Sequence, residues 1–416
     1  MSSVIPSPAL PLEVLEHITD WIGKWPTHVY NMERNEFVWS ESRDATLLAC
    51  ALTCHAWYFR SRLNLLRSIR FPSRERLAKF TAFLAAKPHF GEYVASIYIE
   101  NELGSNSHKA VPPVAPFPLM LARYLPQLGF LQFKLSTFPL VHNSFYLGLS
   151  EFTSLVHLSV RSINFRSVED FGRLAFGFPN LQILSCTNIQ WTKNRFDPLV
   201  IRRHGPHTHL TDLHVMGLPA SIADIFRVFV DATAGASLRD IKLYTSVPLQ
   251  DMETIGLGRL WQAAGASLRL VEFGVFANVN LDAEKLKNTV EQHLSLAQNV
   301  NLTSLTMGLM VGNDPDYSWL PVFLSQITSR EFHEIIFNVW IPPQFHGDPN
   351  IEGIIQRVLD LIHCNLIEET LSLTKFAKLQ SVTFKIPRTT EVWKWDEALL
   401  TRLPKLHTRN ILHCSA

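Results

Sequence analysis

Runs of like charge are missing from this 416-residue chain. Its 38 lysines and arginines are balanced by 37 aspartates and glutamates, which leaves a formal net charge of +1. A protein that binds nucleic acid usually carries a basic stripe or patch that neutralises phosphates. The sequence therefore predicts no nucleic-acid partner.

Cysteine is also scarce. Five cysteines are scattered along the chain, at Cys50, Cys54, Cys186, Cys364 and Cys414. An odd number at irregular spacing favours free thiols in a reducing compartment over a disulfide framework.

Long apolar runs are absent as well. The longest strongly apolar run covers residues 47–52, far short of the roughly 20 residues that a membrane-spanning helix needs. The first residues show neither a basic segment nor a long apolar segment, so no secretory signal is expected. These absences predict a cytoplasmic or nuclear protein without a membrane partner.

Sequence motifs of catalysis and of cofactor or metal binding are missing too. The chain has no phosphate-binding glycine loop, no dinucleotide fingerprint, no His-Glu-x-x-His and no Gly-x-Ser-x-Gly. Cys50, Cys54 and His55 lie close together, but no second ligand pair accompanies them, so zinc is not expected. We expect a protein that is not an enzyme and that needs no cofactor and no metal.

The chain does have enough apolar residues to build a sizeable core, at 47% of the sequence. Its first residues, 1–9, are predicted to be a flexible lead. Three short helices should follow, over 10–22, 45–54 and 57–66, with Asp44 as the N-cap of the second. Residues 24–43 form an insert between the first and second of these helices.

Beyond the helices, one short pattern dominates the chain: apolar-x-x-apolar-x-apolar. It occurs at residues 66–71, 94–99, 128–133, 155–160, 181–186, 210–215, 238–243, 268–273, 302–307, 332–337 and 379–384. The intervals are close to, or somewhat above, the roughly 20–29 residues of leucine-rich repeats. Because helical patterns lie between these short strands, the sequence predicts an α/β solenoid over 69–416. A proline-rich loop is expected at 104–118.

The N-terminal segment resembles an F-box. The resemblance is carried by Leu10-Pro11-x-Glu13-Val14, then by Leu52-Thr53-Cys54-His55-Ala56-Trp57, and then by Leu65-Leu66-Arg67-Ser68-Ile69. It covers residues 10–71, of which 10–68 are expected to form a three-helix domain, and the remainder looks like the degenerate leucine-rich repeats that follow an F-box in fungal-type substrate receptors. The insert at 24–43 departs from the family, in which the helices follow one another closely.

This resemblance implies a substrate receptor of a Skp–cullin–F-box ubiquitin ligase. The F-box would bind a Skp-family adaptor, and through it a cullin, while the repeats would bind a protein target. The family pattern assigns adaptor contacts to Leu10, Pro11, Val14, Ile18, Leu52 and Trp57. For several of these side chains a place in the core of the helical unit is the alternative. A repeat scaffold without a ubiquitin-ligase role is the alternative for the whole chain.

The target surface is predicted on the strands. In a solenoid of this kind, parallel strands line the concave face and the helices lie outside. The side chains that alternate with the apolar positions should therefore point away from the core. On this basis the predicted target contacts are Arg161, His214, Lys242, Tyr244 and Glu272.

Overall fold

The computed structural model describes residues 11–24, 28–31, 36–39, 41–100, 114–193, 209–232, 234–276, 283–310, 317–341, 351–386 and 392–415. The chain divides into two compact units. The first comprises Met1–Leu135 with Pro139–Val156, and the second comprises Ser136–Phe138 with His157–Ala416. The first unit holds the helical segment and the first repeats, and the second holds the remaining repeats.

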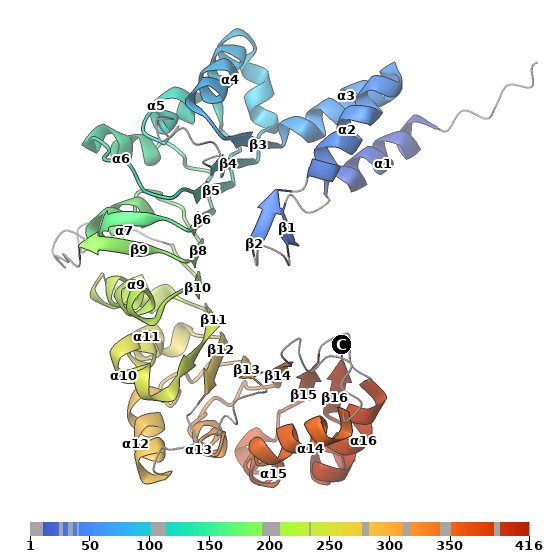
Figure 1. Cartoon of the computed structure of the whole chain (residues 1–416), viewed down its shortest axis with the longest axis vertical. Coiled ribbons are helices and arrows are strands. Elements are labelled where there is room, and N and C mark those ends of the chain that lie inside the picture. The colour runs from blue at the N-terminus through green and yellow to red at the C-terminus, as the bar shows by residue number, and fades with distance from the viewer. Residues whose placement is uncertain are drawn as a thin grey trace, which may run out of the picture. The chain divides into compact units, whose positions relative to one another are not determined.

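Three helices open the first unit: α1 (Leu12–Gly23), α2 (Glu41–Thr53) and α3 (His55–Leu66) (Figure 1). The expected N-cap at Asp44 is wrong, because α2 begins at Glu41 and Asp44 lies within its first turn. The Asp44 carboxylate instead accepts a hydrogen bond from Arg43 Nη1 at 2.8 Å. Residues 1–9, which were predicted to be a flexible lead, lie outside the described residues.

The insert between α1 and α2 contains a β-hairpin. Strands β1 (His28–Asn31) and β2 (Glu36–Trp39) pair antiparallel, with Val29 opposite Val38 and Tyr30 opposite Phe37. Aromatic and β-branched residues favour strands, which is why this segment pairs with itself instead of extending a helix.

The repeats of the first unit follow α3. Strands β3 (Ser68–Phe71), β4 (Ser96–Glu100) and β5 (Phe130–Lys134) pair in parallel. Helices α4 (Arg74–Ala86), α5 (Phe117–Leu121) and α6 (Asn143–Leu149) belong to the same unit. Within the predicted proline-rich loop, residues 104–113 lie outside the described residues, whereas Phe117 and Pro118 are buried in α5.

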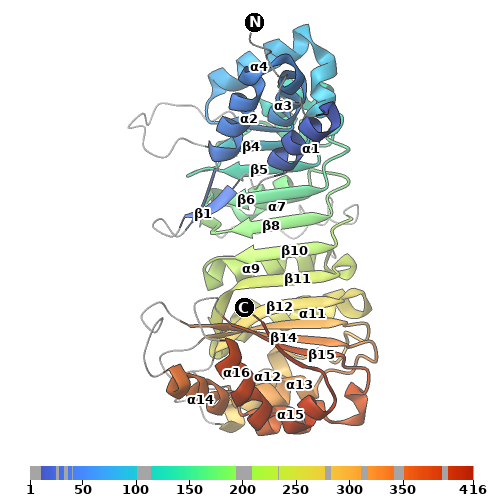
Figure 2. The ribbon, with the colours of Figure 1, turned by 90° about the vertical axis from the view of Figure 1, so that its right-hand side faces the viewer.

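The second unit contains a long series of similar parallel strands. Its parallel strands, which lie side by side in Figure 2, are β6 (His157–Arg161), β8 (Ile183–Thr187), β10 (Asp212–Met216), β11 (Asp240–Pro248), β12 (Leu270–Phe276), β13 (Ser304–Met310), β14 (Glu334–Trp340), β15 (Ser381–Lys385) and β16 (Leu412–Ser415). Strands β7 (Asn164–Ser167) and β9 (Gln190–Lys193) form a separate parallel pair.

Helices follow most of these strands. They are α7 (Val168–Ala175), α9 (Pro219–Asp231), α10 (Met252–Ile255), α11 (Leu257–Ala264), α12 (Ala283–His293), α13 (Leu320–Ser325), α14 (Ile351–Leu361), α15 (Cys364–Leu371), α16 (Val392–Arg402) and α17 (Pro404–Thr408). In Figure 1, α7, α9 and α11 lie on one side of strands β8 to β11. We call the opposite side of the strands in this unit the open face.

Burial alternates along strands β8, β10 and β15, as the repeat pattern requires. In β10, Leu213 and Val215 are buried, while Asp212, His214 and Met216 are half-buried. The buried positions face the helices and form the core, and the alternate positions form the open face. All the predicted repeat segments coincide with strands, so the α/β solenoid of leucine-rich-repeat type is confirmed.

The turns after β6 and β8 satisfy their backbone without asparagine side chains. Ser162 N donates to Thr187 O at 2.8 Å, and Asn188 N donates to Met216 O at 2.7 Å. Both Ser162 and Asn188 have positive φ angles, 53° and 50°. The left-handed turn thus carries the ladder of hydrogen bonds one residue beyond each strand.

Candidate functional sites

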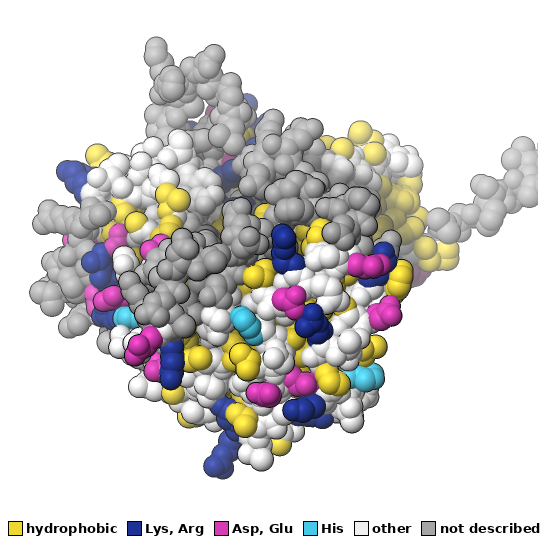
Figure 3. All heavy atoms as spheres, turned by 60° about the horizontal axis from the view of Figure 1, so that its bottom comes forward, with side chains coloured by type: hydrophobic (Ala, Val, Ile, Leu, Met, Phe, Trp, Pro, Cys, Tyr) yellow, Lys and Arg dark blue, Asp and Glu magenta, His cyan; other side chains and the backbone are white. Residues whose placement is uncertain are grey.

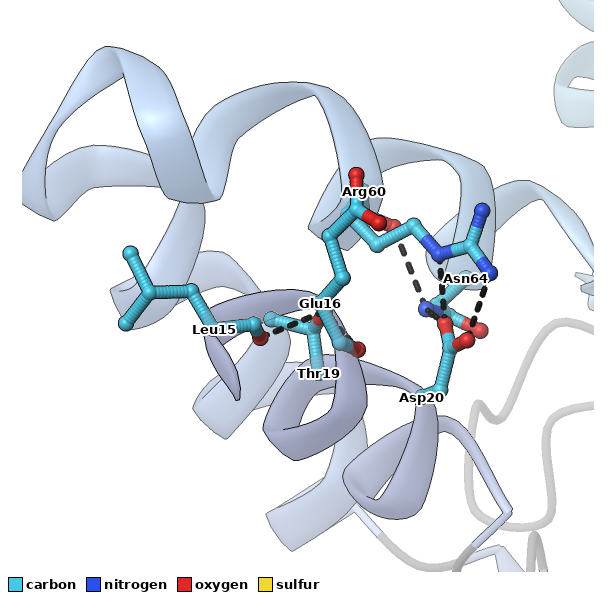
Figure 4. A network of polar contacts seen from close by, with 6 residues as sticks. All are labelled: Leu15, Glu16, Thr19, Asp20, Arg60 and Asn64. Carbon is cyan, nitrogen blue, oxygen red and sulfur yellow. Dashed lines mark hydrogen bonds and ion pairs between the residues drawn. The ribbon is translucent and has the colours of Figure 1, made fainter. Parts of the chain in front are cut away.

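A polar network fixes the helical unit (Figure 4). Arg60 on α3 donates to both carboxylate oxygens of Asp20 on α1, from Nε at 2.7 Å and from Nη2 at 2.5 Å. Asn64, one turn further along α3, donates to Asp20 Oδ1 at 2.9 Å. The hydrogen bond from Arg60 is the main reason why the pKa of Asp20 falls to about 2. A bidentate ion pair between Arg60 and Asp20 therefore joins helices α1 and α3.

Arg43 ties the second helix into the same unit. Its side chain is fully buried, and its guanidinium donates to Gly23 O, to Asp44 Oδ1 and to Asn64 O. A buried guanidinium is tolerated only when such partners replace water. Gly23 leaves space for the Asn64 side chain, because a Cβ at this position would lie 2.3 Å from Asn64 Oδ1.

Large apolar side chains remain exposed on the same three helices. Leu52 at the end of α2 is 84% exposed, and Val14 on α1 is 39% exposed. Their exposed apolar neighbours along these helices are Leu12, Trp21, Leu48, Tyr58 and Phe59. These side chains are therefore accessible to a partner.

The predicted adaptor contacts fall into three groups. Leu10 lies outside the described residues. Pro11, Val14 and Leu52 are exposed, whereas Ile18 and Trp57 are half-buried. None of the five described side chains is fully buried, so they stay accessible in part at least.

The predicted target contacts lie on the open face of the second unit. Register places His214 on β10 beside Lys242 on β11, and Lys242 beside Glu272 on β12. Tyr244 follows on the same strand as Lys242, and its ring lies 6.1 Å from that of His214 in an edge-to-face arrangement. These four residues are therefore neighbours on one surface.

Arg161 stands apart from these four. It lies at the end of β6 and is paired in register with Thr187 on β8, which in turn is paired with Met216. One whole strand, β8, thus separates Arg161 from β10. Its side chain is half-buried.

Two imidazoles flank a hydroxyl on this face. His157 Nε2 lies 3.1 Å from Ser185 Oγ, which lies 3.5 Å from His214 Nδ1. Burial is the main reason why the pKa of His157 falls to about 4, and burial also lowers the pKa of His214. Both rings are therefore neutral at pH 7.

A groove of about 370 Å³ crosses the open face between β11 and β14. Its sides include the half-exposed rings of Tyr244 and Trp340, and Glu272 also lines it. Gly274 and Gly308 stand directly opposite each other in register on β12 and β13. With no side chain at either position, bare backbone lines this part of the groove.

Neither this groove nor the polar network of the helices was predicted from the sequence. Tyr244 and Glu272 were predicted as contacts, but the glycine pair and Trp340 were not. The sequence alone does not show that Gly274 and Gly308 lie opposite each other, because this depends on the register between β12 and β13. The partners of Asp20 lie 40 and 44 residues away in sequence, beyond the reach of any periodicity.

All five cysteines are free thiols, as their odd number predicted. Burial raises the pKa of Cys186 and of Cys364 above the ordinary thiol value. The described residues contain no group of three or more His, Cys, Asp or Glu side chains placed to hold a metal ion. None of the helices in the described ranges is long and apolar enough to cross a bilayer. On the described part of the face drawn in Figure 3, basic and acidic side chains are intermixed.

No protein-family model matches the chain, and no curated protein matches it. Among solved structures, it resembles a chain in the crystal structure of the Rad7 and Elc1 complex in yeast. The two chains are 12% identical, the match covers 94% of this chain and 85% of that chain, and the TM-score is 0.32. So remote a likeness carries nothing about function, which has to be inferred from the residues of this chain.

Proposed function

We propose that this chain is a non-catalytic substrate receptor of a Skp–cullin–F-box ubiquitin ligase. Helices α1 to α3 bind a Skp-family adaptor, which links the chain to a cullin. The open face of the second unit binds a protein target. The F-box resemblance of residues 10–68 supports the first role, and the mixed polar and aromatic surface around Tyr244 supports the second.

The exposed apolar side chains of the helical unit carry this proposal. The three helices are short and are locked by Asp20, Arg60 and Arg43. A unit of this size buries little apolar surface alone. Covering Leu52 and Val14 with a partner would stabilise the complex by about 1.5–3 kcal/mol for each side chain that becomes fully buried. A partner that covers them therefore gains a substantial part of its binding free energy there.

A pull-down with a purified Skp-family adaptor tests the adaptor role. Leu52→Asp places a charge in the proposed contact and should weaken adaptor binding by about tenfold to a few hundredfold. Folding should be unaffected, since Leu52 is already 84% exposed. Retention of full adaptor binding by the folded variant would contradict the proposed docking face.

Leu147→Asp is the matched control. Leu147 lies on α6 in the same compact unit and is 72% exposed. It receives the same change of charge outside the three helices, so adaptor binding should stay at the level of the unmodified protein. Loss of binding in both variants would show a general effect of added charge.

A repeat scaffold without a ubiquitin-ligase role is the second candidate, and the β1–β2 hairpin favours it. The hairpin separates two helices that are adjacent in sequence in an F-box. Failure of the unmodified protein to bind any Skp-family adaptor would support the scaffold. Binding that depends on Leu52 would exclude it.

A further inference from the structure

The groove on the open face contains the carboxylate of Glu272. Glu272 is half-buried and lines the groove. Among the described residues its carboxylate makes no hydrogen bond and no ion pair, although Lys242 and Lys385 lie within electrostatic range. Burial has the larger effect and raises the pKa of Glu272. A partly desolvated carboxylate without hydrogen bonds gains from a cationic hydrogen-bond donor.

Two aromatic rings line the groove together with this carboxylate: Tyr244 lies within electrostatic range of Glu272, whereas Trp340 lies further along the strands, beyond the glycine pair in register. Tyr244 is 51% exposed and Trp340 is 53% exposed, and both line the groove with Glu272. An aromatic face attracts a cation and also packs against a flat group. The surroundings of Glu272 thus suit a cation that is planar as well as charged.

The glycine pair shapes the rest of the groove. A Cβ added at Gly308 would lie 3.4 Å from the Cα of Gly274 and would fill the space above the strands. Without it, an elongated apolar stem can lie against the backbone. The volume of about 370 Å³ is at the lower end of the range for small-ligand sites.

We propose that this groove binds an arginine side chain of the protein target. The guanidinium pairs with the Glu272 carboxylate beside the ring of Tyr244, and the aliphatic stem lies over Gly274 and Gly308, toward the ring of Trp340 at the other end of the groove. Arginine fits better than lysine, because its guanidinium is planar, stacks on aromatic rings and binds a carboxylate through two hydrogen bonds. The inference deepens the proposed target binding and rests on it for the source of the arginine.

Saturation-transfer NMR on the full chain tests the groove directly. The probes are the N-acetyl, N-methylamide derivatives of arginine, lysine and citrulline, the last being a neutral analogue of arginine. The arginine probe should bind. The citrulline probe should bind about tenfold to a hundredfold more weakly, since it lacks the charge that pairs with Glu272. Equal binding of the citrulline or lysine probe would overturn the proposal.

Variants then locate the binding. Glu272→Gln should weaken arginine binding by about tenfold to a hundredfold, and Trp340→Ala should weaken it by about two- to fivefold. Glu334→Gln is the matched control. Glu334 belongs to β14, accepts a hydrogen bond from Ser304 and does not line the groove. Unchanged arginine binding by the folded Glu272→Gln protein would overturn the assignment.

The test is independent of the adaptor. The pull-down with Leu52→Asp reports on the helical unit, whereas the probes report on the second unit. A chain that binds the adaptor but not arginine would refute the groove assignment alone. A chain that binds arginine but no adaptor would support the groove and refute the ligase role.

Discussion

At the scale of single residues, polar side chains that are partly removed from water have shifted pKa values. Asp20 and His157 show the two opposite cases. Asp20 is held in its charged form by Arg60, whereas His157 is held in its neutral form by burial. Each shift makes the stability of the fold depend on pH in a defined window.

Asp20→Asn tests the lock between α1 and α3. The change removes the ion pair with Arg60 and should lower the free energy of unfolding by about 1–3 kcal/mol near pH 7. Because the pKa of Asp20 is depressed in the folded state, its contribution is present above about pH 4 and is lost as pH falls toward 2. Thermal melts followed by circular dichroism measure the loss.

Glu13→Gln is the control for that variant. Glu13 is exposed in the first turn of α1, so its neutralisation should change the melting temperature little. If Asp20→Asn melted at the temperature of the control, the network in Figure 4 would not hold the helices together.

His157 gives a second pH prediction. Its folded pKa of about 4 lies below the ordinary value of 6.5, so only the unfolded chain takes up a proton between these values. Stability should therefore fall as pH decreases below 6.5, by about 2 kcal/mol at pH 5. His157→Gln should remove this part of the pH dependence, as denaturant titrations at pH 7 and pH 5 would show. An unchanged difference between the two pH values would contradict it.

At the scale of elements, the strands were predictable because each repeat carries its own local pattern. Leu181, Leu184 and Cys186 are buried, and the same pattern recurs in every repeat that the sequence identified. Strand β16 was missed because Arg409 occupies the position that corresponds to Leu379 in the previous repeat. Its guanidinium donates to the carbonyls of Leu371, Phe376 and Leu379, so polar contacts replace the apolar one.

Because the repeats are stacked, a destabilising substitution in one strand should also destabilise the neighbouring strands. Leu184 is fully buried in β8 and is paired in register with Leu158 and Leu213 on the neighbouring strands. Leu184→Asp places a charge among them and should cost more than about 3 kcal/mol. Hydrogen exchange should show that protection is lost in β6 and β10 as well as in β8.

Thr187→Asp is the matched change on the other face. Thr187 belongs to the same strand but is half-buried on the open face, so its backbone protection should persist. Loss of protection confined to β8 in the Leu184 variant would contradict a stack that shares stability between neighbours.

At the scale of the whole molecule, the α/β solenoid followed from the sequence, whereas the groove did not. Periodicity identifies which side chains enter the core, but it does not set the register between strands. Gly274 meets Gly308 only because β12 and β13 pair in one register. The network around Asp20 similarly depends on how α1 and α3 pack. The sequence thus predicted which strand positions enter the core, and the structure determined which residues meet on the open face.

The final prediction concerns the independence of the two surfaces. Leu52 and Glu272 belong to different compact units, and the adaptor face and the groove share no residue. Leu52→Asp should therefore weaken adaptor binding by about tenfold to a few hundredfold and leave binding of the arginine probe unchanged. Glu272→Gln should do the reverse, and the double variant should show the two losses without further coupling, because independent sites contribute additively. Parallel pull-down and NMR titrations of the four proteins measure this. A loss of adaptor binding in Glu272→Gln would show that the surfaces are coupled, and would require a receptor in which target and adaptor influence each other's affinity.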